Sequence, residues 1–429
     1  MALSDMLRSS GVRNFAKLFS ANVVAQAIGL LVYPILTRIY SPEDFGLLNL
    51  FLSIGGVLVI ISTAEYYNAI VLPKEDKEAV GVVHLSLLLL LAMVLLTGIS
   101  VLFSESIAGI FDTPALAKYY WLMPIMVFVL GAWNILNYWY IRKSFYNRIS
   151  GYQLSNSLLA SVLKIGFGKC NILQGGLIYS GVFAPLFSLI LSVIFSWNLG
   201  IKELFSNASQ NLRQIAGKYR NFPCYSFPKS LINVLAGQSP VLLLTPVFGT
   251  EAIGLWGMAL LFGFTPINLI SKSLFQVLYQ ETVMRVNANQ MIGRFFKRFT
   301  ISVLLGGGTL FGLLFLFIMD IIPFLLGDEW VACGSYIRWM LPWLLCSVLT
   351  SSTGFLADIF FKQGIGFCFE LLTVVLRIIG VVVGIWQKDF FISIIGYTVG
   401  SAIAVLAQFI WLMTLVKTYD QQVQKQELL

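Results

Sequence analysis

Six ionisable residues lie within or at the ends of long apolar segments of this 429-residue chain. The four cations are Arg377, Lys164, Lys272 and Arg38, and the two acids are Glu65 and Glu370. A charged side chain at the centre of a membrane helix costs about 2.5–3.5 kcal/mol, so residues of this kind are candidates for function. Because arginine and lysine bind phosphate and carboxylate groups well, the cations predict the binding of an anion.

The depth of each residue in its segment ranks these candidates. Arg377 and Lys164 lie near the middle of their segments, too deep to reach the surface easily, and we expect them to line a polar cavity.

The other four candidates lie nearer the segment ends. Lys272 and Arg38 can also extend their charged groups to the membrane surface. Glu65 and Glu370 lie toward inner ends. Each acid either neutralises a cation, titrates during transport, or occupies a solvated position at the interface.

Residues suited to catalysis are missing from the sequence. It has no GxSxG, Walker A or HExxH motif, no pair of carboxylates at catalytic spacing, and one histidine, His84. The cysteines are scattered, without a CxxC pair: Cys170, Cys224, Cys333, Cys346 and Cys368. We interpret them as packing residues, with a bridge between Cys170 and Cys333 on the outer face as the alternative. The sequence therefore predicts no enzyme, no metal site and no cofactor.

The composition is that of a polytopic membrane protein. Hydrophobic residues make up 58% of the chain and charged residues 11%, with a mean hydropathy of +0.84; soluble domains carry about 25% charged residues. The apolar runs exceed about 18 residues and lack two-residue alternation, which predicts an all-α fold and not a barrel. The first run is too long for the apolar part of a signal peptide, so we expect no removable signal.

Hydropathy predicts about twelve transmembrane helices, at residues 15–37, 45–70, 80–103, 119–141, 150–169, 175–197, 226–248, 252–277, 299–319, 336–357, 365–386 and 391–415. If both termini are cytoplasmic, the outer loops carry few cations: Arg38, Lys118, Arg338 and Lys388. Of the other 24 Lys and Arg residues, 20 then lie on the inner side and four within spans, in agreement with the positive-inside rule. The net charge of +8 is thereby explained without nucleic acid.

A sequence repeat divides the chain into halves. Leu36-Thr37 recurs as Leu244-Thr245, and the EDFGL of residues 43–47 recurs as EAIGL at 251–255. Such a repeat predicts two six-helix lobes related by a pseudo-twofold axis along the membrane normal. We expect an N-terminal lobe at 1–200, a cytoplasmic linker at 201–225 and a C-terminal lobe at 226–429.

Two local motifs carry further structural predictions. In the turn that opens the second span, Ser41 and Asp44 have the spacing of a capping box and Pro42 suits the first helical position. The basic, amphipathic stretch 285–298 predicts a helix on the inner membrane surface, with Phe295 and Phe296 in the interface.

Four stretches of the chain resemble the polysaccharide-biosynthesis transporters, the Wzx-type O-antigen flippases of the multidrug/oligosaccharidyl-lipid/polysaccharide (MOP) exporter superfamily. They are LLVYPILTRIYSPEDFGLLNLF (30–51), NAIVLPKEDKEAV (68–80), GGLIYSGVFAPLFS (175–188) and GTEAIGLWGMALLFGFTPINLIS (249–271). Where many relatives have Arg-Tyr-Glu before the second stretch, this chain has Glu65-Tyr66-Tyr67, so the family's ion pair there is not expected.

The resemblance implies a MATE-like fold in a bacterial cytoplasmic (inner) membrane. It also implies flipping, by alternating access, of an undecaprenyl-pyrophosphate-linked oligosaccharide, such as an O-antigen repeat unit, to the outer leaflet. Coupling to H+ or Na+ is compatible with this function. The expected partners are the lipid-linked oligosaccharide, membrane lipids, and the polysaccharide polymerase with its chain-length machinery.

Two other functions compete with flipping. The first is an ion-coupled antiporter of a drug or an anionic metabolite in the same superfamily; the deep residues are basic, which disfavours a cationic drug. The second is a membrane enzyme such as an oligosaccharide polymerase or ligase, which we would expect to have a large outer loop.

Overall fold

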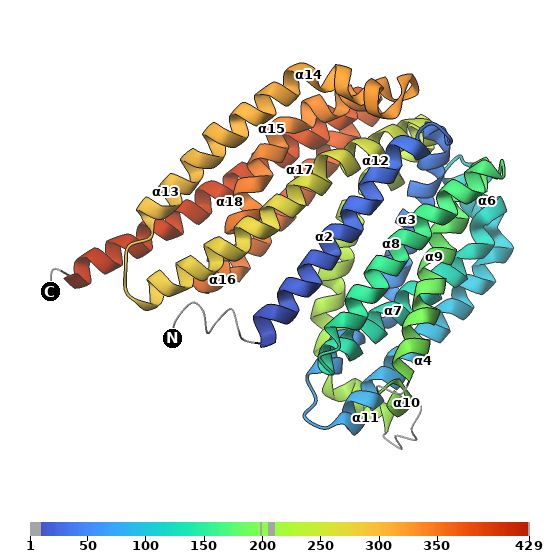
Figure 1. Cartoon of the computed structure of the whole chain (residues 1–429), viewed down its shortest axis with the longest axis horizontal. Helices are drawn as coiled ribbons and strands as arrows, with labels where there is room; N and C mark the ends of the chain where they lie inside the picture. The colour runs from blue at the N-terminus through green and yellow to red at the C-terminus, as the bar shows by residue number, and fades with distance from the viewer. Residues whose placement is uncertain (1–9, 198–199, 205–210, 428–429) are drawn as a thin grey trace. The chain divides into compact units, whose positions relative to one another are not determined.

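The described part of the chain is helical and contains no strand (Figure 1). The computed structural model describes residues 10–197, 200–204 and 211–427, with side chains from 23 to 425 within these ranges. Contacts divide the chain into two compact units, which we call unit 1 (Met1–Gly254) and unit 2 (Leu255–Leu429).

Unit 1 contains antiparallel membrane helices joined by short turns. Its helices are α2 (Ser10–Leu36), α3 (Pro42–Thr63), α4 (Asp76–Ser100), α5 (Ser104–Ile110), α6 (Pro114–Tyr119), α7 (Met123–Arg142), α8 (Tyr146–Lys169), α9 (Leu173–Ser196), α10 (Ile201–Leu204), α11 (Leu212–Lys218) and the first part of α12 (Phe227–Asn287). α8 packs between α2 and α9 (Figure 1). Part of the predicted linker, residues 205–210, lies outside the described residues.

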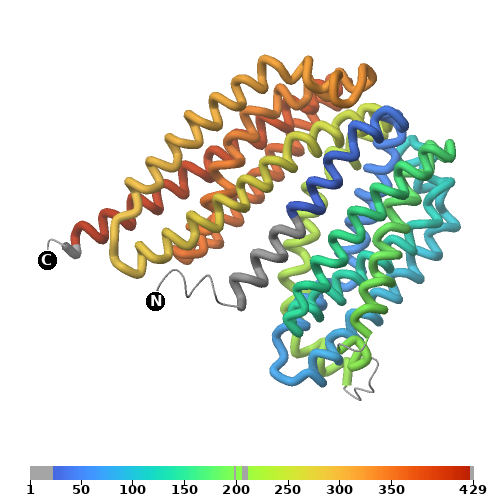
Figure 2. Tube along the Cα trace, in the orientation of Figure 1, coloured from blue at the N-terminus to red at the C-terminus, as the bar shows by residue number. Residues whose placement is uncertain are grey.

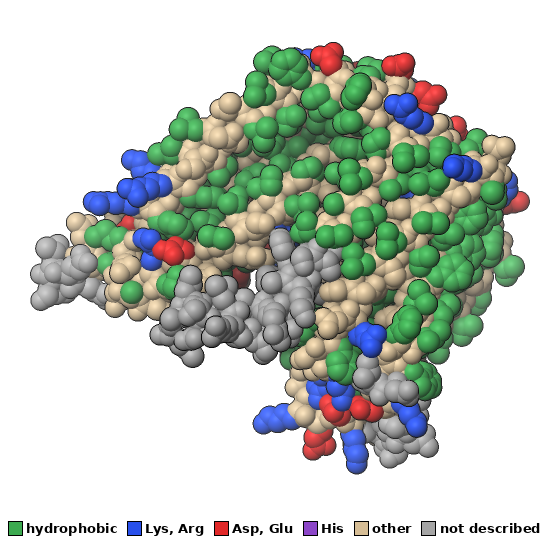
Figure 3. All heavy atoms as spheres, viewed as in Figure 1, with side chains coloured by type: hydrophobic (Ala, Val, Ile, Leu, Met, Phe, Trp, Pro, Cys, Tyr) green, Lys and Arg blue, Asp and Glu red, His purple; other side chains and the backbone are tan. Residues whose placement is uncertain are grey.

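Unit 2 contains the remainder of α12 and the helices that follow it. These are α13 (Gly293–Ser302), α14 (Gly308–Leu326), α15 (Val331–Thr353), α16 (Leu356–Ile359), α17 (Gln363–Gln387) and α18 (Phe390–Glu427). α18 packs along both α17 and α15. In the view of Figure 3, charged side chains lie mainly at the ends of the helices and apolar ones cover the lengths between.

Each of the twelve predicted spans falls largely on described helix. The span predicted at 45–70 is too long, because α3 ends at Thr63 and the left-handed Ala64 and Glu65 follow it, so Glu65 lies in a turn and not inside the span. Nine described helical stretches are long and apolar enough to cross a membrane, and one of them, Phe222–Asn287, carries two predicted spans. Those two spans are separated at Gly249, which has a φ of 80°. α2 contributes a shorter apolar stretch, and α8 is long but too polar to be recognised by composition. The all-α, multi-pass membrane fold is confirmed.

The predicted capping box sets the start of α3. The Asp44 backbone N donates to Ser41 Oγ (3.3 Å), and the Ser41 backbone N donates to Asp44 Oδ2 (3.0 Å). Pro42 occupies the first turn, where no backbone donor is needed. These residues turn the chain sharply from α2 into α3 (Figure 2). In the second copy of the motif, Gly249 takes the place of Ser41 and the helix resumes at Thr250.

The two copies of the motif meet at a pair of glycines in unit 1. A Cβ atom at Gly46 would collide with the backbone carbonyl of Thr250, and one at Gly254 would collide with that of Pro42. The contact is reciprocal, because Gly46 and Gly254 are equivalent in the repeat, as are Pro42 and Thr250. The repeat in the sequence is therefore also a repeat in the structure. Nearby, Asn49 Nδ2 donates to the Ile253 carbonyl (3.5 Å).

In unit 2, glycines likewise allow the close approach of two helices, α17 and α18. A Cβ atom at Gly380 would collide with the backbone of Gly396, and one at Gly384 with Ser393. Small residues four apart let two membrane helices approach closely, so that dispersion forces hold them together in lipid.

One local prediction is wrong. Phe296, which we expected in the membrane interface, is buried in a core cluster of unit 2 together with Phe355 and Leu412. Phe295 packs against this cluster beneath Arg285. The apolar face of the amphipathic stretch therefore packs on protein at Phe296.

We predict that Gly46→Ala destabilises the protein, because the added methyl group meets backbone atoms that cannot move aside. Overpacking of this kind costs about 1–3 kcal/mol, or roughly 2–12 °C in melting temperature. Thermal unfolding of the purified full-length protein in detergent measures the change. Gly98→Ala is the control: a Cβ there meets nothing within 4 Å, and alanine favours a helix by about 0.5–1 kcal/mol. Equal melting temperatures for the two variants would contradict the prediction.

Candidate functional site

Lys164 is half-buried on α8, on the side that packs against α2. Its Nζ lies 5.4 Å from the centroid of the Tyr33 ring. The Tyr40 hydroxyl donates to the backbone carbonyl of Lys164 (2.7 Å), and Ser157 Oγ donates to that of Ala25 (2.7 Å). These bonds fix α8 against α2 and against the turn that follows α2. Lys164 forms no ion pair with any described residue.

A polar stripe extends from Lys164 along α8. It consists of Ser150, Gln153, Asn156, Ser157, Ser161 and Lys164. Apart from the adjacent pair Asn156 and Ser157, they are three or four residues apart, which places them on one side of the helix. The amide oxygens of Gln153 and Asn156 and the hydroxyl of Ser150 are buried, with no hydrogen-bond partner among the described residues. On the neighbouring α7, the amide oxygen of Asn137 is also buried without a hydrogen-bond partner among the described residues.

Buried polar atoms are normally paired, so this concentration of unpaired ones requires an explanation. Each costs about 1–3 kcal/mol when it is left unsatisfied. Amide and hydroxyl groups accept and donate hydrogen bonds to hydroxyl-rich ligands and to water. Groups of this kind suit a polar, uncharged ligand in a conformation that exposes them, and Lys164 lies toward one end of the stripe.

The polar stripe is not among the residues predicted from the sequence. The regular spacing of Ser, Gln and Asn between residues 150 and 161 is the sequence signal for it. Mean hydropathy over the whole span does not contain this signal, because it does not distinguish one side of a helix from the other.

Arg377, on α17, is half-buried and surrounded by aromatic rings of unit 2. Its Cζ lies 5.0 Å from the centroid of the Tyr397 ring and 5.3 Å from that of the Trp343 ring. Its Nε donates to Ser401 Oγ (2.8 Å), and Trp256 packs edge-on against Tyr397. Cation–π contacts of this kind contribute about 0.5–2 kcal/mol each.

The guanidinium of Arg377 retains unused donors. Neither terminal nitrogen donates to a described residue, and no described carboxylate forms an ion pair with it. Tyr397 and Trp343 are buried, so the rings fix the orientation of the guanidinium plane. An oriented guanidinium with two free nitrogens suits a phosphate or carboxylate, which it binds through two parallel hydrogen bonds.

The structure places three other predicted residues at exposed positions. Arg38 lies in the turn between α2 and α3, Lys272 on α12, and Glu370 on α17. Glu370 lies two helical turns from Arg377 on the same side of α17, roughly 10 Å along its axis. No hydrogen bond or ion pair brings any of the six predicted residues together among those described.

Glu65 is buried in the turn that follows α3. Ala64 and Glu65 both adopt the left-handed conformation, with φ of 44° and 60°, which is costly for residues with side chains. Tyr67 and Tyr138 lie close by and contact one another edge-on, with ring centroids 5.1 Å apart. Glu65 forms no ion pair in the described chain, in keeping with the loss of the family's Arg-Tyr-Glu pattern.

The Arg142 side chain fixes the conformation of the NAIVLPKEDKEAV stretch at residues 68–80. Its guanidinium donates to the backbone carbonyls of Ile70 (3.2 Å) and Pro73 (2.7 Å) and also to Asp76. One side chain at the end of α7 therefore holds the whole segment between α3 and α4. This arrangement is structural, since the donors are occupied by protein acceptors.

Lys143 extends the same network. Its Nζ lies 2.8 Å from both Asp76 Oδ2 and Glu203 Oε2. Burial lowers the pKa of Lys143, but the hydrogen bonds to both acids outweigh this effect and leave the pKa above its ordinary value. Lys143 is thus held as a cation that ties α10 to α4.

The described residues contain no group of three or more His, Cys, Asp or Glu side chains that would hold a metal ion. Cys170 and Cys333 are both free thiols; Cys333 is buried and Cys170 is exposed. Two regions of the described chain have groups suited to a ligand. They are the polar stripe of unit 1, with its hydrogen-bond acceptors, and the surroundings of Arg377 in unit 2, with its positive charge.

Comparison with known proteins identifies a family. The sequence model of a family described as polysaccharide biosynthesis protein matches residues 35–335 of the chain. No curated protein sequence is similar enough to the chain to count as a match.

Solved structures share the fold. An inward-facing conformation of a multidrug resistance MATE family transporter of the MOP superfamily has a TM-score of 0.70 at 16% identity, covering 92% of this chain and 96% of that one. An outward-facing conformation of a multidrug resistance MATE family transporter has a TM-score of 0.57 at 16% identity, covering 96% and 97%. At such low identity the likeness concerns the fold alone, and it confirms the predicted MATE-like architecture.

We predict that replacing unpaired amides of the polar stripe, as in the double variant Gln153→Met/Asn156→Leu, does not destabilise the protein. Removing unsatisfied buried groups relieves a cost of about 1–3 kcal/mol each, so the melting temperature in detergent should stay the same or rise. The matched control is Ser53→Ala, which leaves Gln238 Oε1 without its 2.7 Å partner and should lower the melting temperature. A clear loss of stability in the double variant would mean that the amides hold the fold together.

Proposed function

The chain belongs to the polysaccharide biosynthesis protein family, and from this membership we propose that it flips a lipid-linked oligosaccharide across the bacterial cytoplasmic membrane. In this proposal the substrate is an undecaprenyl-pyrophosphate-linked repeat unit, moved from the inner to the outer leaflet by alternating access. Both termini are cytoplasmic in this orientation. The MATE-like fold supports transport, and the proposal adds the substrate and its direction.

The observation that carries the proposal is the unneutralised Arg377 in a membrane helix. A permanent charge in this position costs about 3 kcal/mol unless a counter-charge compensates it, and the described protein supplies no carboxylate. A pyrophosphate would supply the missing charge and accept two parallel hydrogen bonds from the guanidinium. The rings of Trp343 and Tyr397 keep the guanidinium oriented for such a ligand.

The polar stripe suits the oligosaccharide part of the proposed substrate. Sugars present many hydroxyl groups, and the buried amide oxygens of Gln153 and Asn156 are acceptors without donors. Sugar hydroxyls and water would satisfy them in turn as the substrate passes. Lys164 offers a further positive charge on the same side of α8.

The remaining residues take supporting roles in the proposal. Lys272 and Arg38 are exposed cations that attract an anionic substrate. The buried Glu65 and the exposed Glu370 are the candidates for coupling to H+ or Na+. No catalytic step or cofactor is required, and the product would pass to polysaccharide polymerase and its chain-length machinery.

We predict that Arg377→Ala abolishes flipping in cells. Hydrogen bonds to a charged group contribute about 1.5–3 kcal/mol, which is roughly ten- to hundredfold in affinity. Cells lacking the protein should accumulate the lipid-linked oligosaccharide on the inner leaflet; wild type should clear it, and Arg377→Ala should not. Arg377→Lys should clear it only in part, because lysine binds phosphate as a point charge. Lys164→Ala should slow clearance.

Arg338→Ala is the matched control for this experiment. Arg338 is also half-buried in a span of unit 2, and its Cζ lies 4.3 Å from the centroid of the Phe315 ring. Its Nε is buried and has no hydrogen-bond partner among the described residues. It differs from Arg377 in depth, because it lies in the first third of α15 and not near the middle of its helix. We expect it to support normal clearance. If the oligosaccharide is cleared without the protein, the flippase assignment is wrong and the antiporter becomes the leading function. If all variants behave as wild type, the function stands and these residues do not bind the substrate.

A further inference from the structure

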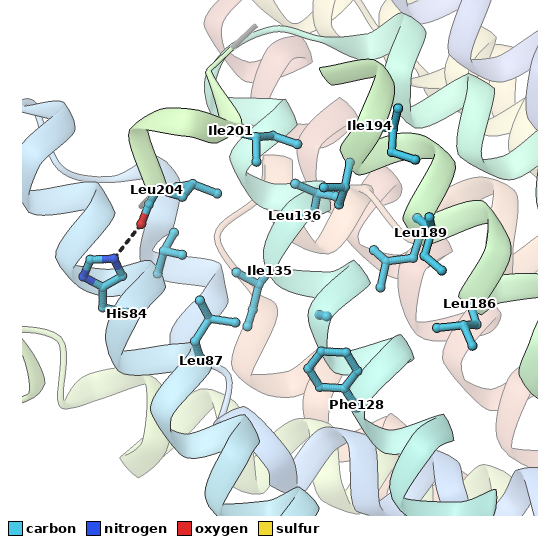
Figure 4. Close-up of a pocket in the computed structure, with 14 residues that line it drawn as sticks. His84, Leu87, Phe128, Ile135, Leu136, Leu186, Leu189, Ile194, Ile201 and Leu204 are labelled. Atoms are coloured by element: carbon cyan, nitrogen blue, oxygen red, sulfur yellow. Dashed lines mark hydrogen bonds between the residues drawn. The ribbon is translucent and has the colours of Figure 1, made fainter. Parts of the chain in front are cut away.

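An apolar cavity of about 630 Å³ lies within unit 1, between α4, α7 and α9 (Figure 4). Its lining includes Leu87 of α4, Phe128 and Ile135 of α7, Leu189 and Ile194 of α9, and Leu204 of α10. Every lining side chain is apolar except that of His84. A cavity of this size is within the range that holds a small organic ligand, about 300–1,000 Å³.

The cavity opens toward lipid. Three of its lining side chains are also exposed: Ile194, Ile190 and Phe128. The exposed fraction of the Ile194 side chain is 62%. The helices that carry these residues cross the membrane, so their exposed apolar side chains face the lipid. The cavity is consequently a lateral groove for an apolar chain, not a path for a polar substrate.

A short helix covers one end of the groove. Ile201 and Leu204 of α10 contribute to the lining, and His84 Nε2 lies 2.7 Å from the Leu204 carbonyl (Figure 4). This bond joins α10 to α4. Lys143 holds α10 a second time through Glu203. The cover is therefore fixed by two polar contacts to membrane helices.

The covered end lies at the level of the membrane interface. Trp197, at the end of α9, is 43% exposed, and tryptophan is enriched at the headgroup level. Lys202 lies between the lining residues Ile201 and Leu204, and it is exposed. The short helix that covers the groove therefore carries an exposed cation, the charge that would attract the head of an acidic lipid.

We propose that this groove binds one alkyl chain of an acidic phospholipid of the inner leaflet, with the lipid phosphate at Lys202. The leaflet follows from the orientation in the proposed function; the chemistry of the ligand does not depend on it. On α9 the lining extends from Leu186 to Ile194, roughly 12 Å of helix. One leaflet's hydrocarbon is roughly 15 Å thick, half of the ~30 Å core, so a phospholipid chain matches the groove in length.

The headgroup provides the selectivity. Moving an alkyl chain from the bilayer into an apolar groove gains little, because lipid tails are as apolar as leucine. A basic residue at the surface adds about fivefold to the affinity for an acidic lipid. Phosphatidylglycerol should therefore bind more tightly than phosphatidylcholine, and Lys202 should account for the difference.

Native mass spectrometry of the full-length protein in mild detergent, titrated with phosphatidylglycerol or phosphatidylcholine, tests the proposal. We expect saturable binding of phosphatidylglycerol, about fivefold weaker binding of phosphatidylcholine, and loss of this preference in Lys202→Ala. Ala132→Phe fills the groove from α7 and should remove the bound lipid. Lys77→Ala and Ala92→Phe change an exposed lysine and an exposed alanine of α4 outside the lining, and should bind as wild type.

Three results would overturn the proposal: equal binding of the two lipids by wild type, undiminished phosphatidylglycerol in Ala132→Phe, or an equal loss in Ala92→Phe. Retention of undecaprenyl phosphate but not phosphatidylglycerol would instead assign the groove to the transported lipid. A melting curve for each variant detects misfolding, and Lys202→Ala, a surface change, tests the headgroup contact even if Ala132→Phe unfolds. Because the readout is lipid binding, its failure is distinct from a failure of the flippase proposal.

Discussion

A charge placed among apolar helices needs a counter-charge or hydrogen-bond acceptors within reach, and this constraint governs the functional part of the protein. Arg142 and Lys143 meet it with backbone carbonyls and carboxylates of the protein itself. Arg377 and Lys164 meet it only in part, through aromatic rings and, for Arg377, one hydroxyl. The first pair stabilises the fold, whereas the second pair is left with binding capacity that a ligand can use.

The two candidate binding regions differ in the chemical groups that they offer. Unit 1 presents uncharged acceptors along α8, and unit 2 presents an oriented guanidinium on α17. In the proposed function, the guanidinium suits a charged pyrophosphate and the uncharged acceptors suit a hydroxyl-rich glycan. The hydrocarbon tail of the substrate would require neither, since the bilayer already solvates it. The apolar groove between α4, α7 and α9 has neither kind of polar group in its lining, which is why we assign it to a lipid chain and not to the glycan.

Local sequence predicted the helices well, because length, apolarity and capping are properties of neighbouring residues. Ser41 and Asp44 form the expected cap, and the predicted spans fall largely on helices. The rings around Arg377 could not be predicted, since Trp343 and Tyr397 come from other helices, and their approach depends on the packing of α15, α17 and α18. Phe296 was misplaced because the apolar face of an amphipathic helix has the same sequence pattern whether it meets lipid or protein.

The glycine crossing between α3 and α12 restricts how this family member can vary. In most packed contacts, a larger residue on one side can be accommodated by a smaller one on the other. Here the atoms facing each glycine belong to the backbone of the opposite helix, and no substitution makes a backbone smaller. No change in the opposite helix can therefore make room for a larger residue. Both copies of the motif require glycine at this position, although their sequences differ elsewhere.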